Sequence, residues 1–184
     1  MKRLSLLIVS IALTWAPTAF GQVTVLGSGL GKDCYDAVRN NTKSLNSLEN
    51  ICTTALLHGK LSPSNRAATF VNRGIVRMRG GDYDAALEDY SAAERLQSSQ
   101  GPIYLNRGAA LIYKQQFEDA LPELSRAIEL DTNDLFAAYY NRAIAKEKIG
   151  DVTGAYLDFK KSLELKPDFE PAISQIERFI VTEN

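Results

Sequence analysis

A short motif recurs three times along this chain at nearly constant spacing. Asparagine and arginine, followed by glycine or alanine, begin at residues 72, 106 and 141, so the offsets are 34 and 35 residues. Three further positions recur in phase with the motif: alanine at 86, 120 and 155, a large apolar residue at 90, 124 and 159, and leucine at 96, 130 and 165. Such self-similarity predicts a stack of equivalent structural units.

Each copy of the motif is predicted to form two helices. Apolar residues recur every three or four positions, which is helical spacing. Breaks divide the copies at Gly80-Gly81, Gln115-Gln116 and Gly150-Asp151. Small residues occupy both helices, where they allow the backbones to approach closely: Gly74, Gly108, Ala143, Ala86, Ala120 and Ala155. Because a single hairpin cannot bury its apolar face alone, the prediction is an all-α stack of helix-turn-helix hairpins.

The flanks of the repeats complete the predicted organisation. Pro171 stands near the start of a last helix, and Ile173, Ile176 and Ile180 give that helix one apolar stripe. Ser62 and Pro63 are typical of an N-cap and a first helical residue. The predicted segments are a signal peptide (1–21), a flexible N-terminus (22–32), a degenerate helical hairpin (33–62), three repeats (63–100, 101–134 and 135–168) and a capping helix (169–184).

The pattern resembles the tetratricopeptide repeat family, whose unit is a helix-turn-helix of 34 residues with small residues at these places. The resemblance covers roughly residues 67–168. Two features depart from it: the proline usual at the end of a unit occurs only as Pro167, and the middle unit has an extra residue near 131–134. The resemblance implies a right-handed superhelical stack. It also implies a concave groove, lined by the first helix of each unit, that accepts an extended peptide or a helix.

The matching positions define a predicted partner-binding groove. Its residues are Val71, Asn72, Ile75, Met78, Leu105, Asn106, Ala109, Ile112, Tyr140, Asn141 and Ile144. One asparagine per unit suits the capture of a peptide backbone through its amide. Alternatively, the apolar stripe buries itself against a neighbouring unit or the N-terminal hairpin. If the stripe is free, changing Ile75 and Tyr140 to glutamate should weaken binding at least about a hundredfold and leave the fold intact.

The groove is predicted to take apolar anchors rather than a terminal carboxylate. Relatives that clamp a C-terminal carboxylate use lysine, arginine and asparagine in the groove. Val71, Ile75 and Ala137 occupy three of those places here. A chaperone-type clamp is therefore not expected.

An arginine on the first helix of each unit is followed by an acid 16 residues later. The three predicted ion pairs are Arg73 with Asp89, Arg107 with Glu123, and Arg142 with Asp158. They would join helices within or between hairpins; the alternative is a solvated face with coincidental signs.

The N-terminus indicates export. Lys2 and Arg3 precede an apolar stretch, and small residues end at Gly21, which is the pattern of a secretory signal peptide. An uncleaved anchor is the alternative. Cys34 and Cys52 are the only cysteines, and in an oxidising compartment they favour a disulfide over free thiols. A periplasmic location is favoured and secretion is the alternative.

Composition and motifs argue against catalysis. With 21 basic and 22 acidic residues, no net field favours nucleic acid or anionic lipid. His58 is the only histidine, and no nucleophile motif or metal-ligand set accompanies it, so no enzyme activity, cofactor or metal is expected. The predicted function is a non-catalytic protein-binding scaffold of the cell envelope. The alternatives are a self-associating structural component and an accessory subunit of an envelope protease or cell-wall enzyme.

Overall fold

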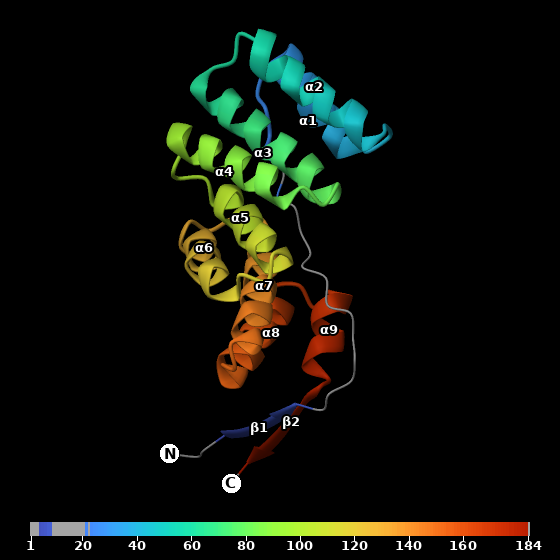
Figure 1. Ribbon diagram of the computed structural model, residues 1–184. Helices are drawn as coiled ribbons and strands as arrows, with labels where there is room; N and C mark the ends of the chain where they lie inside the picture. Colours follow the sequence, from blue (N-terminus) through green and yellow to red (C-terminus); the bar gives the residue numbers. More distant parts are fainter. Residues whose placement is uncertain (1–3, 9–20, 22, 184) are drawn as a thin grey trace.

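The computed structural model describes residues 4–8, 21 and 23–183. Within them the chain forms helices α1 to α9 and strands β1 and β2 (Figure 1). The helices are α1 (Leu30–Asn40), α2 (Leu45–His58), α3 (Pro63–Arg79), α4 (Tyr83–Leu96), α5 (Gly101–Tyr113), α6 (Phe117–Glu129), α7 (Leu135–Lys148), α8 (Val152–Leu165) and α9 (Glu170–Ile176). The strands are β1 (Leu4–Ile8) and β2 (Phe179–Glu183).

The helices pack as successive hairpins. α1 packs on α2, α3 on α4, α5 on α6 and α7 on α8, and each hairpin stacks on the next along the molecule (Figure 1). The first helices also meet one another, because α5 contacts both α3 and α7. This arrangement confirms the predicted all-α stack of hairpins.

Each repeat turns at the predicted place, with one residue in the left-handed region. Gly81 and Gly150 have φ of 80° and 88°, and Gln115 takes the same position in the middle repeat with φ of 60°. Glycine carries no Cβ penalty there, whereas glutamine does. Asp82 and Asp151 then cap the second helices by accepting hydrogen bonds from the amides of Ala85 (3.2 Å) and Gly154 (2.9 Å).

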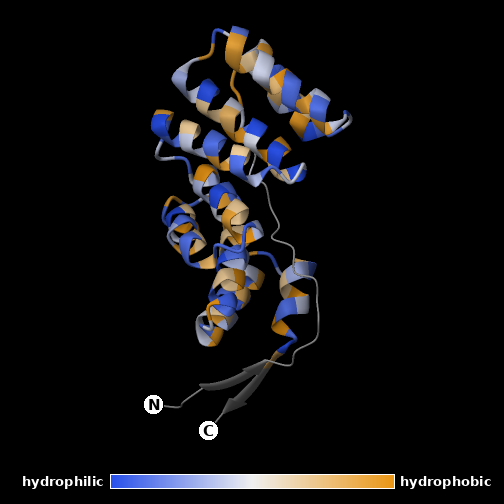
Figure 2. Ribbon diagram, in the orientation of Figure 1, coloured by the Kyte–Doolittle hydropathy of each residue, from blue (hydrophilic) through white to orange (hydrophobic). Residues whose placement is uncertain are grey.

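Small residues let the paired helices approach, as the sequence predicts. A Cβ at Gly74 would lie 2.5 Å from Cε1 of Tyr90, and one at Gly108 would lie 2.6 Å from Cγ of Leu124. Both of these large side chains are fully buried. The buried apolar residues of the helices form one core cluster, and hydrophilic and hydrophobic residues alternate along the helices (Figure 2).

The N-terminal hairpin contains the predicted disulfide. Cys34 on α1 is bonded to Cys52 on α2, and both are fully buried. Ser62 caps α3 as predicted, accepting from the amide of Asn65 at 3.2 Å. Helix α1 begins at Leu30, inside the segment 22–32 for which flexibility is predicted.

The C-terminal end differs from the predicted capping helix over 169–184. Helix α9 ends at Ile176, and β2 then pairs antiparallel with β1, from Leu4 opposite Glu183 to Ile8 opposite Phe179. Ile180, Val181 and Thr182 are β-branched, and such residues favour a strand over a helix. The all-α prediction applies to the chain after the signal peptide, and β1 of this two-stranded sheet lies inside the predicted signal peptide. Most of the predicted signal peptide lies outside the described residues.

Candidate functional site

The first helices of the three repeats present a continuous surface, here called the inner surface, which carries the predicted groove residues. Each of the 11 predicted residues is at most 4% exposed: Val71, Asn72, Ile75, Met78, Leu105, Asn106, Ala109, Ile112, Tyr140, Asn141 and Ile144. The expectation of a free apolar stripe therefore needs correction, because in this structure the stripe is covered. A binding role for these residues stays a prediction.

Part of the cover is the chain's own N-terminal segment, defined here as residue 21 and residues 23–26. It passes α3 on its way to α1, as the blue trace ahead of α1 shows (Figure 1). Asn106 donates from Nδ2 to the carbonyl of Gly21 at 3.0 Å, and Asn72 donates in the same way to the carbonyl of Val23 at 3.1 Å. Val23 to Leu26, inside the segment 22–32 for which flexibility is predicted, thus lie against α3 here, and the flexibility of the segment stays a prediction.

Asn65, which the sequence analysis did not single out, holds the end of this segment. Its Nδ2 donates to the carbonyl of Leu26 at 2.8 Å, and its Oδ1 accepts from the amide of Leu26 at 3.2 Å. Asn65 lies seven residues before Asn72 on α3, and that spacing places both on one side of a helix. This spacing is the sequence signal that could have identified Asn65 as a further backbone-binding residue.

Asn141 repeats the asparagine position in the third unit without such a partner. It is fully buried, and within the described part of the chain both Nδ2 and Oδ1 lack a hydrogen bond. The Oδ1 atoms of Asn72 and Asn106 are likewise buried and unbonded there. A buried polar group without a partner costs about 1–3 kcal/mol, so this row of amides keeps unused bonding capacity.

Aromatic side chains close the inner surface at the third repeat. The ring of Tyr140 lies 5.6 Å from that of Phe159 on α8 and 5.2 Å from that of Phe169, which precedes α9. Edge-on contacts at these distances are favourable. Burial of its hydroxyl, first among several causes, raises the pKa of Tyr140 to about 12. Tyr140 is therefore a core residue here.

The three arginines contact the predicted acids. Arg73 reaches Asp89 with two hydrogen bonds of 2.7 and 3.0 Å, and Arg142 reaches Asp158 with two of 2.8 and 2.9 Å. Arg107 donates from Nε to Glu123 at 2.7 Å. Hydrogen bonding to Asp158, more than any other cause, raises the pKa of Arg142.

The same arginines also reach the preceding hairpin. The Nη1 atoms of Arg73 and Arg142 donate to Thr53 on α2 and Ser125 on α6, at 3.1 and 3.2 Å. In the middle repeat Nη1 of Arg107 donates to Glu94 on α4 at 2.5 Å, and this hydrogen bond is the main reason that the pKa of Glu94 is lowered. Each arginine thus joins two helices of its own hairpin to the hairpin before it.

A double-mutant cycle on Arg107 and Glu123 tests this bond. Because both side chains are mostly buried, we expect Arg107→Ala and Glu123→Ala together to cost about 1 kcal/mol less than the sum of the single changes. Urea denaturation measures the three free energies. The exposed pair Arg126 and Glu129, 3.0 Å apart, is the control and should show coupling near zero. Additive effects in both cycles would refute a direct Arg107–Glu123 interaction.

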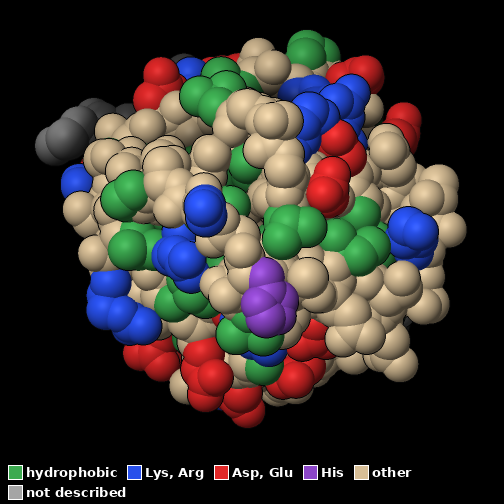
Figure 3. All heavy atoms as spheres, turned by 90° about the horizontal axis from the view of Figure 1, so that it is seen from above, with side chains coloured by type: hydrophobic (Ala, Val, Ile, Leu, Met, Phe, Trp, Pro, Cys, Tyr) green, Lys and Arg blue, Asp and Glu red, His purple; other side chains and the backbone are tan. Residues whose placement is uncertain are grey.

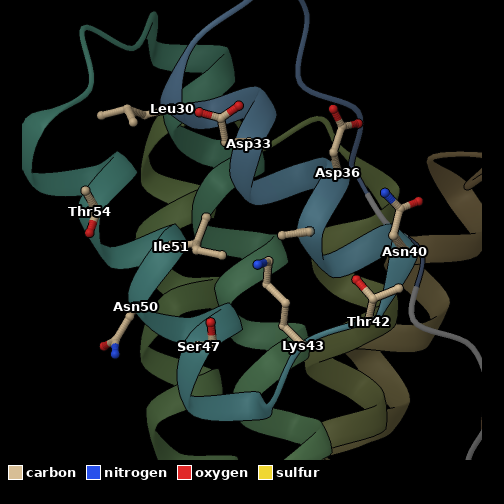
Figure 4. Close-up of a pocket in the computed structure, with 11 residues that line it drawn as sticks. Leu30, Asp33, Asp36, Asn40, Thr42, Lys43, Ser47, Asn50, Ile51 and Thr54 are labelled. Carbon is tan, nitrogen blue, oxygen red and sulfur yellow. The ribbon is translucent and has the colours of Figure 1, made fainter.

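Apart from the inner surface, a pocket lies between α1 and α2 at the free end of the stack. It has a volume of about 760 Å³, and Ala37 and Ile51 line it together with Asp33, Asp36 and Lys43 (Figure 4). The end of the molecule seen from above mixes acidic, basic and apolar side chains without one dominant patch (Figure 3). This pocket offers neither a metal-ligand cluster nor a continuous apolar floor.

The described residues contain no group of three or more histidine, cysteine, aspartate or glutamate side chains placed to hold a metal. In that same part of the chain, no helix has the length and apolar character to cross a membrane.

A comparison with known protein families identifies two of the repeats. The family model described as Tetratricopeptide repeat matches residues 101–134 and 136–169. These are the second and third hairpins of the repeat array, α5–α6 and α7–α8, with the residues just beyond α8. The chain therefore contains tetratricopeptide repeats over these two hairpins.

The matches to curated relatives cover about half of the chain. The chain is 30% identical over 100 residues to protein unc-45 homolog B of Xenopus laevis, covering 53% of this chain and 11% of the relative. It is 34% identical over 86 residues to human serine/threonine-protein phosphatase 5, covering 47% of this chain and 17% of the relative. The chain therefore spans less than a fifth of the length of these relatives.

Solved structures extend the likeness to most of the chain. The crystal structure of MamA matches with a TM-score of 0.66 at 21% identity, covering 82% of each chain, which shows a shared fold. The second tetratricopeptide-repeat domain of human RPAP3, solved in complex with the HSP70 peptide SGPTIEEVD, matches with a TM-score of 0.59 at 26% identity. That match covers 63% of this chain and 96% of the RPAP3 domain.

Proposed function

We propose that this protein is a non-catalytic scaffold that binds an extended peptide segment of a partner protein on the inner surface of its repeats. One observation carries the proposal: asparagine side chains of α3 and α5 already hold the backbone of a peptide segment there, at Gly21, Val23 and Leu26. Backbone capture by amides places little demand on the sequence of the ligand, and apolar anchors supply the rest. The RPAP3 complex with a peptide supports the same use of the fold.

The chemistry of the inner surface favours an apolar peptide over an acidic terminus. Val71, Ile75 and Ala137 are apolar side chains where a carboxylate clamp would need polar or basic ones. The nearby arginines are also engaged, since Arg73, Arg107 and Arg142 are bonded to acids.

Peptide selection followed by variants tests this function. Extended peptides selected by display on the full chain should bind it, and Asn141→Ala should weaken that binding about tenfold, because it removes two backbone hydrogen bonds. Asn46→Ala, on the exposed side of α2, is the matched control and should bind as the parent does. Fluorescence anisotropy measures both. If the affinity of the selected peptides is unchanged by Asn141→Ala and by every other substitution on the inner surface, the peptides do not bind at this site.

We further propose that the protein acts in the cell envelope after export, most simply in the periplasm. The basic start, the apolar stretch and the small residues before residue 22 support this, as does a disulfide, which persists in oxidising compartments. Intact mass of protein from its native compartment should correspond to a chain that begins near Gln22 and carries no free thiol. A full-length mass, or two alkylated cysteines, would count against export with cleavage. If the protein instead associates with itself, the same preparation should contain a dimer. If it is an accessory subunit, the preparation should contain a catalytic partner.

A further inference from the structure

The N-terminal segment has the features of a ligand of the inner surface. The carbonyls of alternate residues, Gly21 and Val23, both point to the row of asparagines, as one edge of an extended backbone does. Between this segment and α1 stand Gly27 to Gly29, with φ of 96° and 98° at the two glycines, so the chain turns away immediately after Leu26.

The side chains of the segment also occupy small sites between neighbouring residues, here called seats. Val25 is 5% exposed and lies against α1, because its Cγ1 is 3.2 Å from the place where a Cβ on Gly31 would stand. Val23 is partly buried and packs against the core. Thr24, between Val23 and Val25, is exposed. At Gly21 a Cβ would lie 3.1 Å from Oδ2 of Asp134, so this seat accepts only a very small residue.

The segment uses only part of the bonding capacity of the asparagine row. Asn65 exchanges two hydrogen bonds with Leu26, one as donor and one as acceptor. Asn72 and Asn106 each make only the donor half, and their Oδ1 atoms stay buried and unbonded among the described residues. A peptide that bonded all of these atoms, and Asn141 as well, would recover free energy that the segment leaves unused.

We propose, on the basis of the function proposed above, that the N-terminal segment is a built-in occupant of the inner surface and that a partner peptide binds by replacing it. The partner is an extended peptide in the same direction, with its N-terminal end toward α7. It has glycine or alanine in the seat of Gly21 and β-branched apolar residues in the seats of Val23 and Val25. The covalent attachment of the segment to α1 gives the segment a high effective concentration. The partner peptide nevertheless displaces the segment, because the partner also bonds to Asn141.

The test uses the full chain and a capped, fluorescent peptide copy of residues 21–26. In the variant Val23→Asp with Val25→Asp, the acidic side chains no longer suit the apolar seats, so the surface opens. We expect this variant to bind the probe at least about tenfold more tightly than the parent chain, because the competitor at high effective concentration is gone. Thr24→Asp, at an exposed position, is the control and should bind the probe as the parent does. Adding Asn72→Ala and Asn106→Ala to the open variant should abolish the gain.

A second measurement does not depend on the folding of a variant. In the parent chain the amide of Leu26 donates to Oδ1 of Asn65 at 3.2 Å, and its hydrogen exchange should accelerate severalfold when a display-selected peptide saturates the surface.

The outcomes separate this inference from the proposed function. Equal probe binding by the parent and the open variant, or no binding by either, overturns the built-in occupant. So does hydrogen exchange at the Leu26 amide that a bound peptide leaves unchanged. In all three cases the function stands if selected peptides still depend on Asn141, and it falls with the inference only if they do not.

Discussion

Replacing Ile75 with glutamate is expected to destabilise the protein by about 5 kcal/mol, which is comparable to the whole stability of a small domain. Ile75 lies on α3 and is fully buried. The substitution removes a large apolar side chain from the core, and it either buries a carboxylate or holds it protonated far from its ordinary pKa. Thermal and urea denaturation followed by circular dichroism measure the loss.

Two control variants isolate the effect of burial. Ile75→Val keeps the apolar character and should cost about 1 kcal/mol. Leu157→Glu introduces the same charge on α8 at a side chain that is 53% exposed, and it should cost less than about 0.5 kcal/mol. If Ile75→Glu folds with native stability and loses only peptide binding, the inner surface is open in solution and its cover in this structure is not a stable state.

The sequence predicts the repeat architecture closely because repeats are defined by local rules. Helical spacing, a turn between helices and a small residue at each close approach suffice to place the hairpins from α3 to α8. The arginine–acid pairs follow for the same reason. A separation of 16 residues, repeated three times, spans the turn of each hairpin and brings the two side chains together.

The state of the inner surface does not follow from those rules. Periodicity shows which side of α3 carries Val71 and Ile75, but it cannot show that a segment almost 50 residues earlier lies over that side. The alternation of Val23, Thr24 and Val25 was a weak signal of a strand-like ligand, and the glycines after it favoured a flexible interpretation. The early end of α9 has a similar origin, because the preference of residues 180–182 for a strand is realised only through pairing with β1.

Export would alter both of these long-range contacts. Cleavage after Gly21 removes β1, so β2 loses the strand with which it pairs. Cleavage also removes the carbonyl to which Asn106 donates, while the bonds of Asn72 and Asn65 to Val23 and Leu26 remain. The mature chain is therefore expected to hold its segment by α3 alone, and Asn106 on α5 loses the carbonyl to which it donates.

Removal of the disulfide is expected to have the second largest effect on stability. Cys34 and Cys52 close a loop with a sequence separation of 18, and the bond is worth about 3 kcal/mol in the chain-entropy model. Helix α1 is held otherwise by its packing on α2 and α3, where Val38 and Leu48 are fully buried. The double variant Cys34→Ala, Cys52→Ala should therefore lose stability mainly in this hairpin.

Hydrogen exchange resolved along the chain distinguishes local from global loss. Because α1 lies at the edge of the stack, its amides over residues 30–40 should exchange much faster in the variant, while those of α5 to α8 should change little. Thr54→Ala, at an exposed position on α2, controls for substitution in the hairpin and should leave exchange unchanged. Uniform acceleration over all hairpins would instead mean that the disulfide stabilises the stack as a whole, and unchanged exchange in α1 would mean that helix packing alone holds it.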